Sequence, residues 1–223
     1  QGYSVDVDKF NECMIKQKKQ ARSADRFRYN DKNTKWITIQ NDISTKFTGY
    51  EGFQSKAKLI KYNKNDEFHE IVLDITPFYA ESGGQVGDTG RLEADKFKFA
   101  VTNVIKNGDQ FIHIGKIESG NIDGIVEVTA IIDNNRRQQI RRNHTATHLL
   151  HQTLKDILGE HVHQAGSLVA PDLLRFDLTH YEKISHKQIE KIDQRVNTMI
   201  LDNKEVSTEI KSYENAHKEG AIS

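Results

Sequence analysis

The sequence predicts an α+β protein that begins with a helix, continues as a small antiparallel β-barrel subdomain and ends in a two-layer α/β core. Three observations support this prediction. Residues 6–24 are amphipathic with helical spacing, short alternating or β-branched runs fill 27–133, and a period of 3.6 residues returns after Asp133. We therefore divide the chain into three regions: 1–25, 26–133 and 134–223.

The first region is predicted to be a helix because its least polar residues recur at spacings of three and four. These residues form one stripe: Phe10, Met14, Gln17 and Ala21. Asp6 or Asp8 can cap its N-terminus. The other sides are polar, so we expect this helix to pack lightly or to pack against a segment outside the sequence.

The second region contains short runs that are typical of strands. They are KWITIQ (35–40), SKAKLIKY (55–62), EFHEIVLDI (67–75), KFKFAVTNVI (96–105), QFIHIGKI (110–117) and IVEVTAIID (125–133). Turn-forming residues such as Asn107-Gly108-Asp109 separate the runs, and no helical crossover joins them. This spacing favours an antiparallel barrel over a parallel sheet.

The third region opens with a long helix over 134–158, followed by Gly159 where an αL C-terminal cap is expected. The remaining elements are expected in this order: a hairpin of strands 162–170 and 173–180 joined across Pro171-Asp172, a helix from a Ser185–Gln188 capping box to about Asp202, and a short strand at 205–211. The last residues show no strand that would complete a sheet. We therefore expect the core to continue past residue 223.

Composition excludes several classes of protein. The 32 Lys and Arg residues balance the 32 Asp and Glu residues, so no chain-wide field attracts nucleic acid. No segment approaches the roughly 18 to 20 consecutive apolar residues of a membrane span, and the N-terminus lacks the features of a secretory signal. Cys13 is the only cysteine and cannot form an internal disulfide. We expect a cytoplasmic protein with no membrane partner.

The predicted long helix carries a pair of histidines, His144 and His148, on one stripe with Ile140 and His151. Imidazoles four residues apart lie about 5 to 6 Å apart at Cβ, close enough to share a metal such as zinc. A metalloprotease would need Glu directly after the first histidine, where Thr145 stands. The structural alternative is a hydrogen-bonded histidine in a core or groove.

Four arginines precede this histidine pair within seven residues: Arg136, Arg137, Arg141 and Arg142. They lie one to two helical turns from the histidines, where they could hold a phosphate backbone. The alternative is a solvated helix face. The juxtaposition of the two clusters favours the nucleic-acid interpretation.

The segment FYAESGGQVGDTG (78–90) has four glycines in eight residues, which lets its backbone approach a ligand closely. It lacks the Lys-Ser/Thr and the following helix of a phosphate-binding loop, so that route to nucleotide binding is excluded. Its Gly-Gly-Gln triplet resembles the ester-hydrolysing loop of peptide-release factors. A tight connection under the barrel is the structural alternative.

The segments RRNHTATHLLHQTLKDILGEHVHQAGSLVAPDLLRFDLTH (141–180) and FYAESGGQVGDTG (78–90) together resemble the editing domain of alanyl-tRNA synthetase. The likeness covers nearly the whole chain. It implies a module that hydrolyses the ester of Ser- or Gly-charged alanine tRNA, with the rest of the synthetase chain and alanine tRNA as partners. The family also includes freestanding editing proteins. Residues 5–24 resemble the segment that links the tRNA-recognition helices to the editing domain, which favours a piece of a synthetase.

The resemblance also implies roles for individual residues. The family holds zinc with a His-x-x-x-His pair, matched by His144 and His148, and with a later Cys-x-x-x-His pair that residues 1–223 lack. We therefore expect this chain to bind zinc weakly or not at all and to hydrolyse little mischarged tRNA. The remaining candidates are catalytic Gln164, Thr147 and Gln85, and substrate-binding Gly83, Gly84, Ser167, Arg175 and Asp177.

Two other functions stay open at this point. One is a noncatalytic tRNA-docking module, in which the histidines are structural and the arginines carry the function. The other is a freestanding deacylase. The editing interpretation further predicts that His144 and His148 face a cleft bordered by the Gly83-Gly84-Gln85 loop and Gln164.

Overall fold

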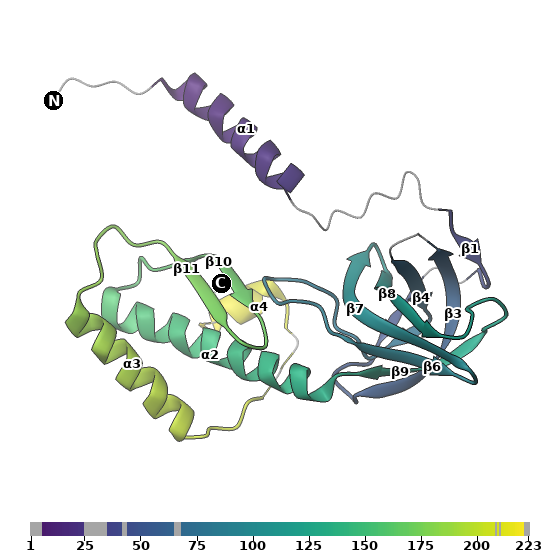
Figure 1. Cartoon of the computed structure of the whole chain (residues 1–223). Coiled ribbons are helices and arrows are strands. Elements are labelled where there is room, and N and C mark those ends of the chain that lie inside the picture. The colour runs from purple at the N-terminus through teal and green to yellow at the C-terminus, as the bar shows by residue number, and fades with distance from the viewer. Residues whose placement is uncertain are drawn as a thin grey trace. The chain divides into compact units, whose positions relative to one another are not determined.

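The computed structural model describes residues 6–24, 35–41, 44–64, 68–207, 209 and 211–220. The chain forms two units, Gln1–Trp36 and Ile37–Ser223. The described residues of the first unit include helix α1 (Val7–Ala24), and the second unit contains both strands and helices (Figure 1). The predicted α+β class is confirmed.

Helix α1 begins where the sequence predicts, because the Asp6 carboxylate accepts a hydrogen bond from the backbone N–H of Lys9 at 3.0 Å. Two of its apolar side chains, Phe10 and Ile15, keep 56% and 66% of their surface accessible. The predicted boundary at residue 25 lies outside the described residues.

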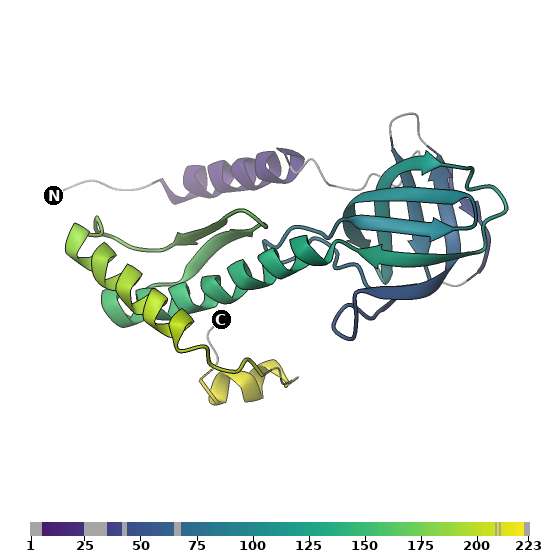
Figure 2. The same ribbon diagram turned by 60° about the horizontal axis from the view of Figure 1, so that its bottom comes forward.

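Six antiparallel strands close into a barrel (Figure 2). In spatial order they are β3 (Gln54–Lys64), β4 (His69–Leu73), β8 (Gln110–Ser119), β7 (Phe97–Asn107), β6 (Gly90–Ala94) and β9 (Glu127–Ile132). Closure depends on the length of β3, whose first half pairs with β9 and whose second half pairs with β4. Three two-residue strands are peripheral: β1 (Ile37–Thr38) on β3, and β2 (Lys46–Phe47) paired with β5 (Ile75–Thr76).

The barrel interior is filled by side chains that alternate along each strand. On β7, for example, Phe97, Phe99 and Val101 are buried while Lys98 is exposed. A histidine, His113 of β8, lies among them. Its Nε2 is 2.7 Å from the Thr76 hydroxyl and its Nδ1 is 3.0 Å from the Ile71 carbonyl oxygen.

The second part of this unit is built on helix α2 (Asn134–Leu158), which follows β9 with Asp133 between them. The Asp133 carboxylate accepts a hydrogen bond from the backbone N–H of Arg136 and caps the helix. Helix α3 (His186–Leu201) and the antiparallel hairpin of β10 (Gln164–Val169) and β11 (Leu174–Leu178) pack against α2. The predicted capping box of Ser185 and Gln188 is present.

A second, smaller hydrophobic core lies between α2, α3 and the hairpin. Its buried members are Leu154, Val162 and Ile192, with Leu150 and Phe176 packed against them. In the described part of the chain, no helix is long and apolar enough to span a bilayer.

Several details of the sequence-based prediction are wrong. The described residues of the expected strand at 205–211 are not in a strand, and a short helix, α4 (Tyr213–Lys218), follows instead because Ser212 caps it. Gly159 ends α2, but with φ 116° and ψ 165° rather than in the αL conformation. Strand β6 was not among the six predicted runs; it is only five residues long, and its first residue, Gly90, belongs to the glycine-rich segment.

Candidate functional site

Helix α2 places the two predicted metal ligands side by side. The ring centroids of His144 and His148 are 5.0 Å apart, and the ring planes differ by 21°. Burial lowers the pKa of His144, and the neighbouring His148 lowers it further. Both effects favour the neutral imidazole, which is the form that binds a metal.

These two imidazoles fit one half of a tetrahedral zinc site. Zinc generally takes three or four protein ligands, and no cluster of three His, Cys, Asp or Glu side chains suited to a metal occurs among the described residues. The nearby ring of His151 packs on Phe176, with centroids 5.0 Å apart. Any further ligand must come from outside the described residues, so zinc binding stays a prediction.

The glycine-rich segment lies along the edge of the hairpin. The backbone N–H of Val86 donates to the carbonyl oxygen of Val169 at 3.1 Å, and the N–H of Val169 donates to the carbonyl oxygen of Gly84 at 2.8 Å. Gly84 has φ +84°, and a Cβ atom there would collide with the hydroxyl and carbonyl of Ser167. Close approach of the two backbones therefore requires glycine at this position.

Polar side chains connect the hairpin to this segment. Gln164 Nε2 donates to Ser167 Oγ at 3.1 Å, and Ser167 Oγ donates to the carbonyl oxygen of Gly83 at 3.4 Å. The register of β10 shifts between Gln164 and Gly166, as in a β-bulge, which re-aims side chains locally. Gln164, Ser167, Gly83 and Gly84 thus form one contiguous group, which we call the loop–hairpin cluster.

Two predicted substrate-binding residues lie on the other face of the hairpin. Ser167 pairs with Phe176, and the Phe176 side chain packs toward α2. Side chains alternate along a strand, so Arg175 and Asp177, on either side of Phe176, point away from α2. They form an exposed ion pair at 3.0 Å. Asp177 pairs with Gly166, the residue before Ser167, and the substrate-binding role of Arg175 and Asp177 stays a prediction.

The other two catalytic candidates are nearly buried. The Thr147 hydroxyl donates to the carbonyl oxygen of Asn143, one turn earlier, at 2.8 Å. Gln85 is 8% exposed, and its backbone forms a tight turn with Ser82. Asn143, which the sequence analysis missed, joins α2 to the hairpin turn. Its Nδ2 donates to the carbonyl oxygens of Ala170 and Pro171.

The four arginines do not share one environment. Arg141 and Arg142 are exposed, and Arg136 donates to the carbonyl oxygen of Gly87 at 2.8 Å. The Arg137 side chain is 7% exposed and forms an ion pair with Asp88, whose side chain is 2% exposed. Burial of Arg137 corrects the expectation that all four arginines contact nucleic acid.

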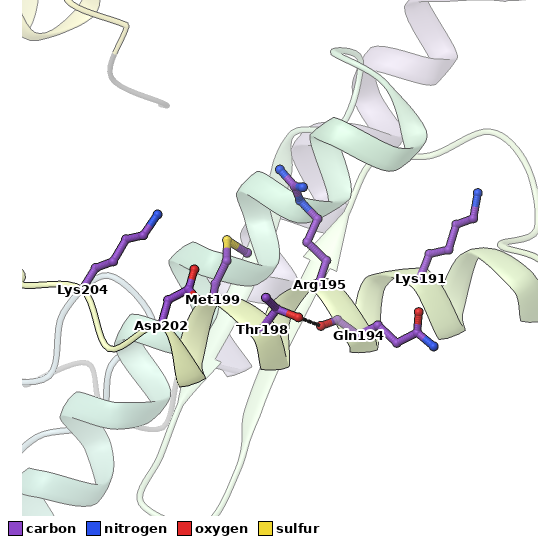
Figure 3. A pocket seen from close by; sticks show the side chains of 7 residues that line it. All are labelled: Lys191, Gln194, Arg195, Thr198, Met199, Asp202 and Lys204. Carbon is purple, nitrogen blue, oxygen red and sulfur yellow. Dashed lines mark hydrogen bonds between the residues drawn. The ribbon is translucent and has the colours of Figure 1, made fainter.

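A separate depression lies along α3 (Figure 3). Its volume is about 480 Å³, and its lining residues include Lys191, Arg195 and Met199. Their side chains project from the same helix, whose Thr198 hydroxyl bonds to the Gln194 carbonyl oxygen. No predicted site residue lines this depression, so it is not the candidate site.

The chain is similar to known proteins along nearly its whole length. Residues 1–136 match the family described as tRNA synthetases class II (A). The chain belongs to this family. It is 45% identical to an alanine-tRNA ligase of Thermoanaerobacter sp. (strain X514) over 234 residues, which cover 99% of this chain and 26% of that protein.

Two further alanine-tRNA ligases show a similar level of identity. The chain is 41% identical over 227 residues to an alanine-tRNA ligase of Halorhodospira halophila, and 40% identical over 233 residues to one of Legionella pneumophila (strain Corby). These alignments cover 98% and 100% of this chain. The chain spans about a quarter of the length of the relatives it matches. The family match ends two residues after the start of α2, so the histidine pair and the hairpin are covered by the relatives alone.

Proposed function

We propose that this chain is the editing portion of an alanyl-tRNA synthetase and hydrolyses the ester of Ser- or Gly-charged alanine tRNA. The observation that carries the proposal is the loop–hairpin cluster, in which the Gly83–Gln85 turn is held against the strand of Gln164 and Ser167. The similarity to alanine-tRNA ligases over nearly the whole chain supports the choice of tRNA.

A synthetase for alanine has a physical reason to edit. A pocket that accepts the alanyl methyl group cannot strongly reject glycine, which lacks it, or serine, which adds a hydroxyl. One methyl group contributes about 1 to 3 kcal/mol of discrimination, or roughly 10- to 200-fold. A second site that removes the wrong amino acid after transfer supplies the missing accuracy.

The hydroxyl of serine is the feature that the second site must recognise. In the proposed site, Gln164 Nε2 and Ser167 Oγ are hydrogen-bonded to each other, and a substrate hydroxyl can replace one partner. An alanyl ester offers no such group and leaves a polar atom unpaired, at a cost of about 1 to 3 kcal/mol. Correctly charged alanine tRNA is thereby spared.

The histidine pair would contribute to metal binding. His144 and His148 would hold zinc together with ligands outside the described residues. Such a zinc would polarise the ester or lower the pKa of a water molecule to about 7. Burial lowers the pKa of His144, which favours the neutral form that this role requires.

Alanine tRNA itself would be held by exposed cations. Arg141 and Arg142 are both exposed and lie within one turn of His144 on α2. Phosphate contacts from these two residues would position the tRNA without reading its sequence. We place this activity in the cytoplasm, with the remainder of the synthetase chain as the covalent partner.

The decisive experiment is a deacylation assay with Ser-tRNA(Ala) and Ala-tRNA(Ala) as substrates. The full-length protein should hydrolyse the seryl ester and spare the alanyl ester. Gln164→Ala should reduce this preference, whereas Gln152→Ala, an exposed change on α2 away from the cluster, should not. Tight tRNA binding without hydrolysis would instead identify a noncatalytic docking module. Full activity of residues 1–223 alone would identify a freestanding deacylase.

A further inference from the structure

Arg137 joins helix α2 to one end of the barrel through a buried guanidinium group. Its Nε lies 3.0 and 3.1 Å from the two carboxylate oxygens of Asp88, and its Nη2 also contacts that carboxylate. Nη1 donates to the carbonyl oxygen of Gly49 at 2.9 Å, and Nη2 donates to that of Pro77 at 2.9 Å. One side chain therefore connects three separate segments to α2.

Asp88, in turn, closes the base of the glycine-rich loop. Its carboxylate accepts a hydrogen bond from the N–H of Tyr79 at 2.8 Å, and its own N–H donates to the carbonyl oxygen of Tyr79 at 3.0 Å. The chain from Tyr79 to Asp88 is thus a loop with its two ends held together. Its far end carries Gly84, which pairs with Val169 of the hairpin.

The base and the tip of this loop are attached to different parts of the unit built on α2. The base is held by Arg137, in the first turn of α2, and the tip is held by the hairpin that packs against α2. His144 follows Arg137 by seven residues, a rise of about 10 Å along the helix. The position of the loop along α2 is therefore set relative to the histidine pair.

We propose that Arg137 and Asp88 are positioning residues, which fix the Gly83–Gln85 turn relative to His144 and His148. The barrel then serves as the rigid support of the loop from Tyr79 to Asp88. This inference rests on the proposed function only for its kinetic consequence; the structural consequence stands independently.

The chemistry of the pair supports a positioning role. A buried ion pair adds little net stability, because desolvation of both charges offsets their attraction. A planar guanidinium, however, binds a carboxylate bidentately and reaches two further carbonyls in fixed directions, which lysine cannot do. Arginine at this position therefore determines orientation more than it determines stability.

The first measurement is hydrogen exchange of the backbone amides of Val86 and Val169, which form the bonds at the loop tip. In Arg137→Lys, we expect these amides to exchange at least about 10-fold faster, while the barrel amide of Leu59, bonded to Val126, keeps its protection. Asp88→Asn is the milder variant, used if Arg137→Lys does not fold. The control is Val128→Ala, a barrel-core deletion on β9 at a position that pairs with Ala57 of β3.

The second measurement is deacylation of Ser-tRNA(Ala) by the full-length protein. Misplacement of a reacting group by about 1 Å can cost 100-fold in rate. We expect kcat to fall about 10- to 100-fold in Arg137→Lys while KM changes less than about twofold, and Val128→Ala to lower the melting temperature without this kcat loss.

Each outcome decides the inference. Unchanged exchange of Val86 and Val169 in Arg137→Lys overturns it, as does a kcat loss of the same size in Val128→Ala at equal melting temperature. If the unmodified protein does not hydrolyse Ser-tRNA(Ala), the proposed function fails. The exchange measurement alone then decides whether Arg137 positions the loop.

Discussion

The side-chain amide of Asn143 donates to the carbonyl oxygen of Ala170 at 2.7 Å, which ties the helix of the histidine pair to the hairpin turn. Asn143 is the residue directly before His144, so this bond acts next to the candidate metal ligand. A weaker bond to Pro171, at 3.3 Å, shares the same amide nitrogen.

Replacement of Asn143 with Asp should therefore destabilise the protein. A carboxylate has nearly the same shape but no hydrogen to donate, and it would face two carbonyl oxygens. We expect a loss of about 1 to 3 kcal/mol in the free energy of unfolding, measured by urea denaturation. Gln138→Glu, an amide-to-acid change at an exposed hydrogen bond on the same helix, is the control and should change stability much less. Equal losses in both variants would contradict a specific role for Asn143.

Gly84 and Gly83 should respond differently to alanine. Both have positive φ, +84° and +59°, so both substitutions introduce backbone strain. Only at Gly84 would the new methyl group also collide with Ser167, whereas nothing lies within 4 Å of a Cβ atom at Gly83. We expect Gly83→Ala to cost about 1 to 2 kcal/mol and Gly84→Ala to cost clearly more in thermal unfolding. A larger cost at Gly83 would show that the loop does not lie on the hairpin as described.

The barrel should lose stability in acid because of His113. Burial lowers the pKa of His113 from 6.5 to about 4. The unfolded chain therefore takes up a proton before the folded protein does. The stabilising contribution is complete above pH 6.5 and is lost as the pH falls from 6.5 to 4. The total is about 3 kcal/mol, from 1.36 kcal/mol for each unit of pKa difference.

Urea denaturation at several pH values between 7 and 4 tests this expectation. His113→Gln is the appropriate variant, because its amide can bond to Thr76 but does not titrate. Its free energy of unfolding should fall less steeply over this pH range. A variant with the same slope as the unmodified protein would assign the acid sensitivity to other groups.

Arg141 and Arg142 are expected to contact tRNA phosphates. The double substitution Arg141→Ala/Arg142→Ala should weaken tRNA binding and reduce the slope of log K against log salt by about 1 to 2, because fewer counterions are released. Filter binding at 50 to 200 mM salt measures this slope. Lys187→Ala/Lys191→Ala removes two exposed cations of α3 instead and should leave the slope nearly unchanged. An unaltered slope in the arginine variant would mark these residues as a solvated helix face.

Residues 1–223 are expected to bind zinc weakly. Two imidazoles on one helix supply only two of the three or four ligands that zinc takes in proteins. Titration with zinc, followed by a chromogenic chelator, should show no stoichiometric tight binding. Tight binding that His148→Ala abolishes would mean that other residues of the chain complete the site.

The sequence predicted the elements whose information is local. The N-caps Asp6 and Ser185 lie within three residues of the amides they bind, so both helix starts were predictable. Five of the six predicted runs became barrel strands, whereas KWITIQ (35–40) contributes only the peripheral strand β1. Strand β6 was not among the predicted runs because its alternation covers only Arg91 to Ala94, directly after a glycine-rich segment, which is the lower limit of length for a strand pattern.

The predicted site depended on contacts between distant residues, and there the prediction was incomplete. From the sequence, Arg137 was predicted to belong to a basic helix face. Only the fold brings Asp88, 49 residues earlier, beside it. Asp88 was nevertheless visible as an acidic residue in the glycine-rich segment. Strand alternation would have predicted that Arg175 and Ser167 face opposite sides of the hairpin, if Phe176 had been assigned to the core.

The single residue between β9 and α2 makes the spacing of this junction critical. Each residue inserted into a helix start turns the rest of that helix by about 100°. One extra residue beside Asp133 would thus rotate α2, and with it His144, His148 and the hairpin packed on this helix, relative to the barrel. Length variation among related chains should therefore accumulate at other positions, such as the turn at Asn107–Gly108. An insertion there changes the orientation of neither the histidines nor the Gly83–Gln85 turn.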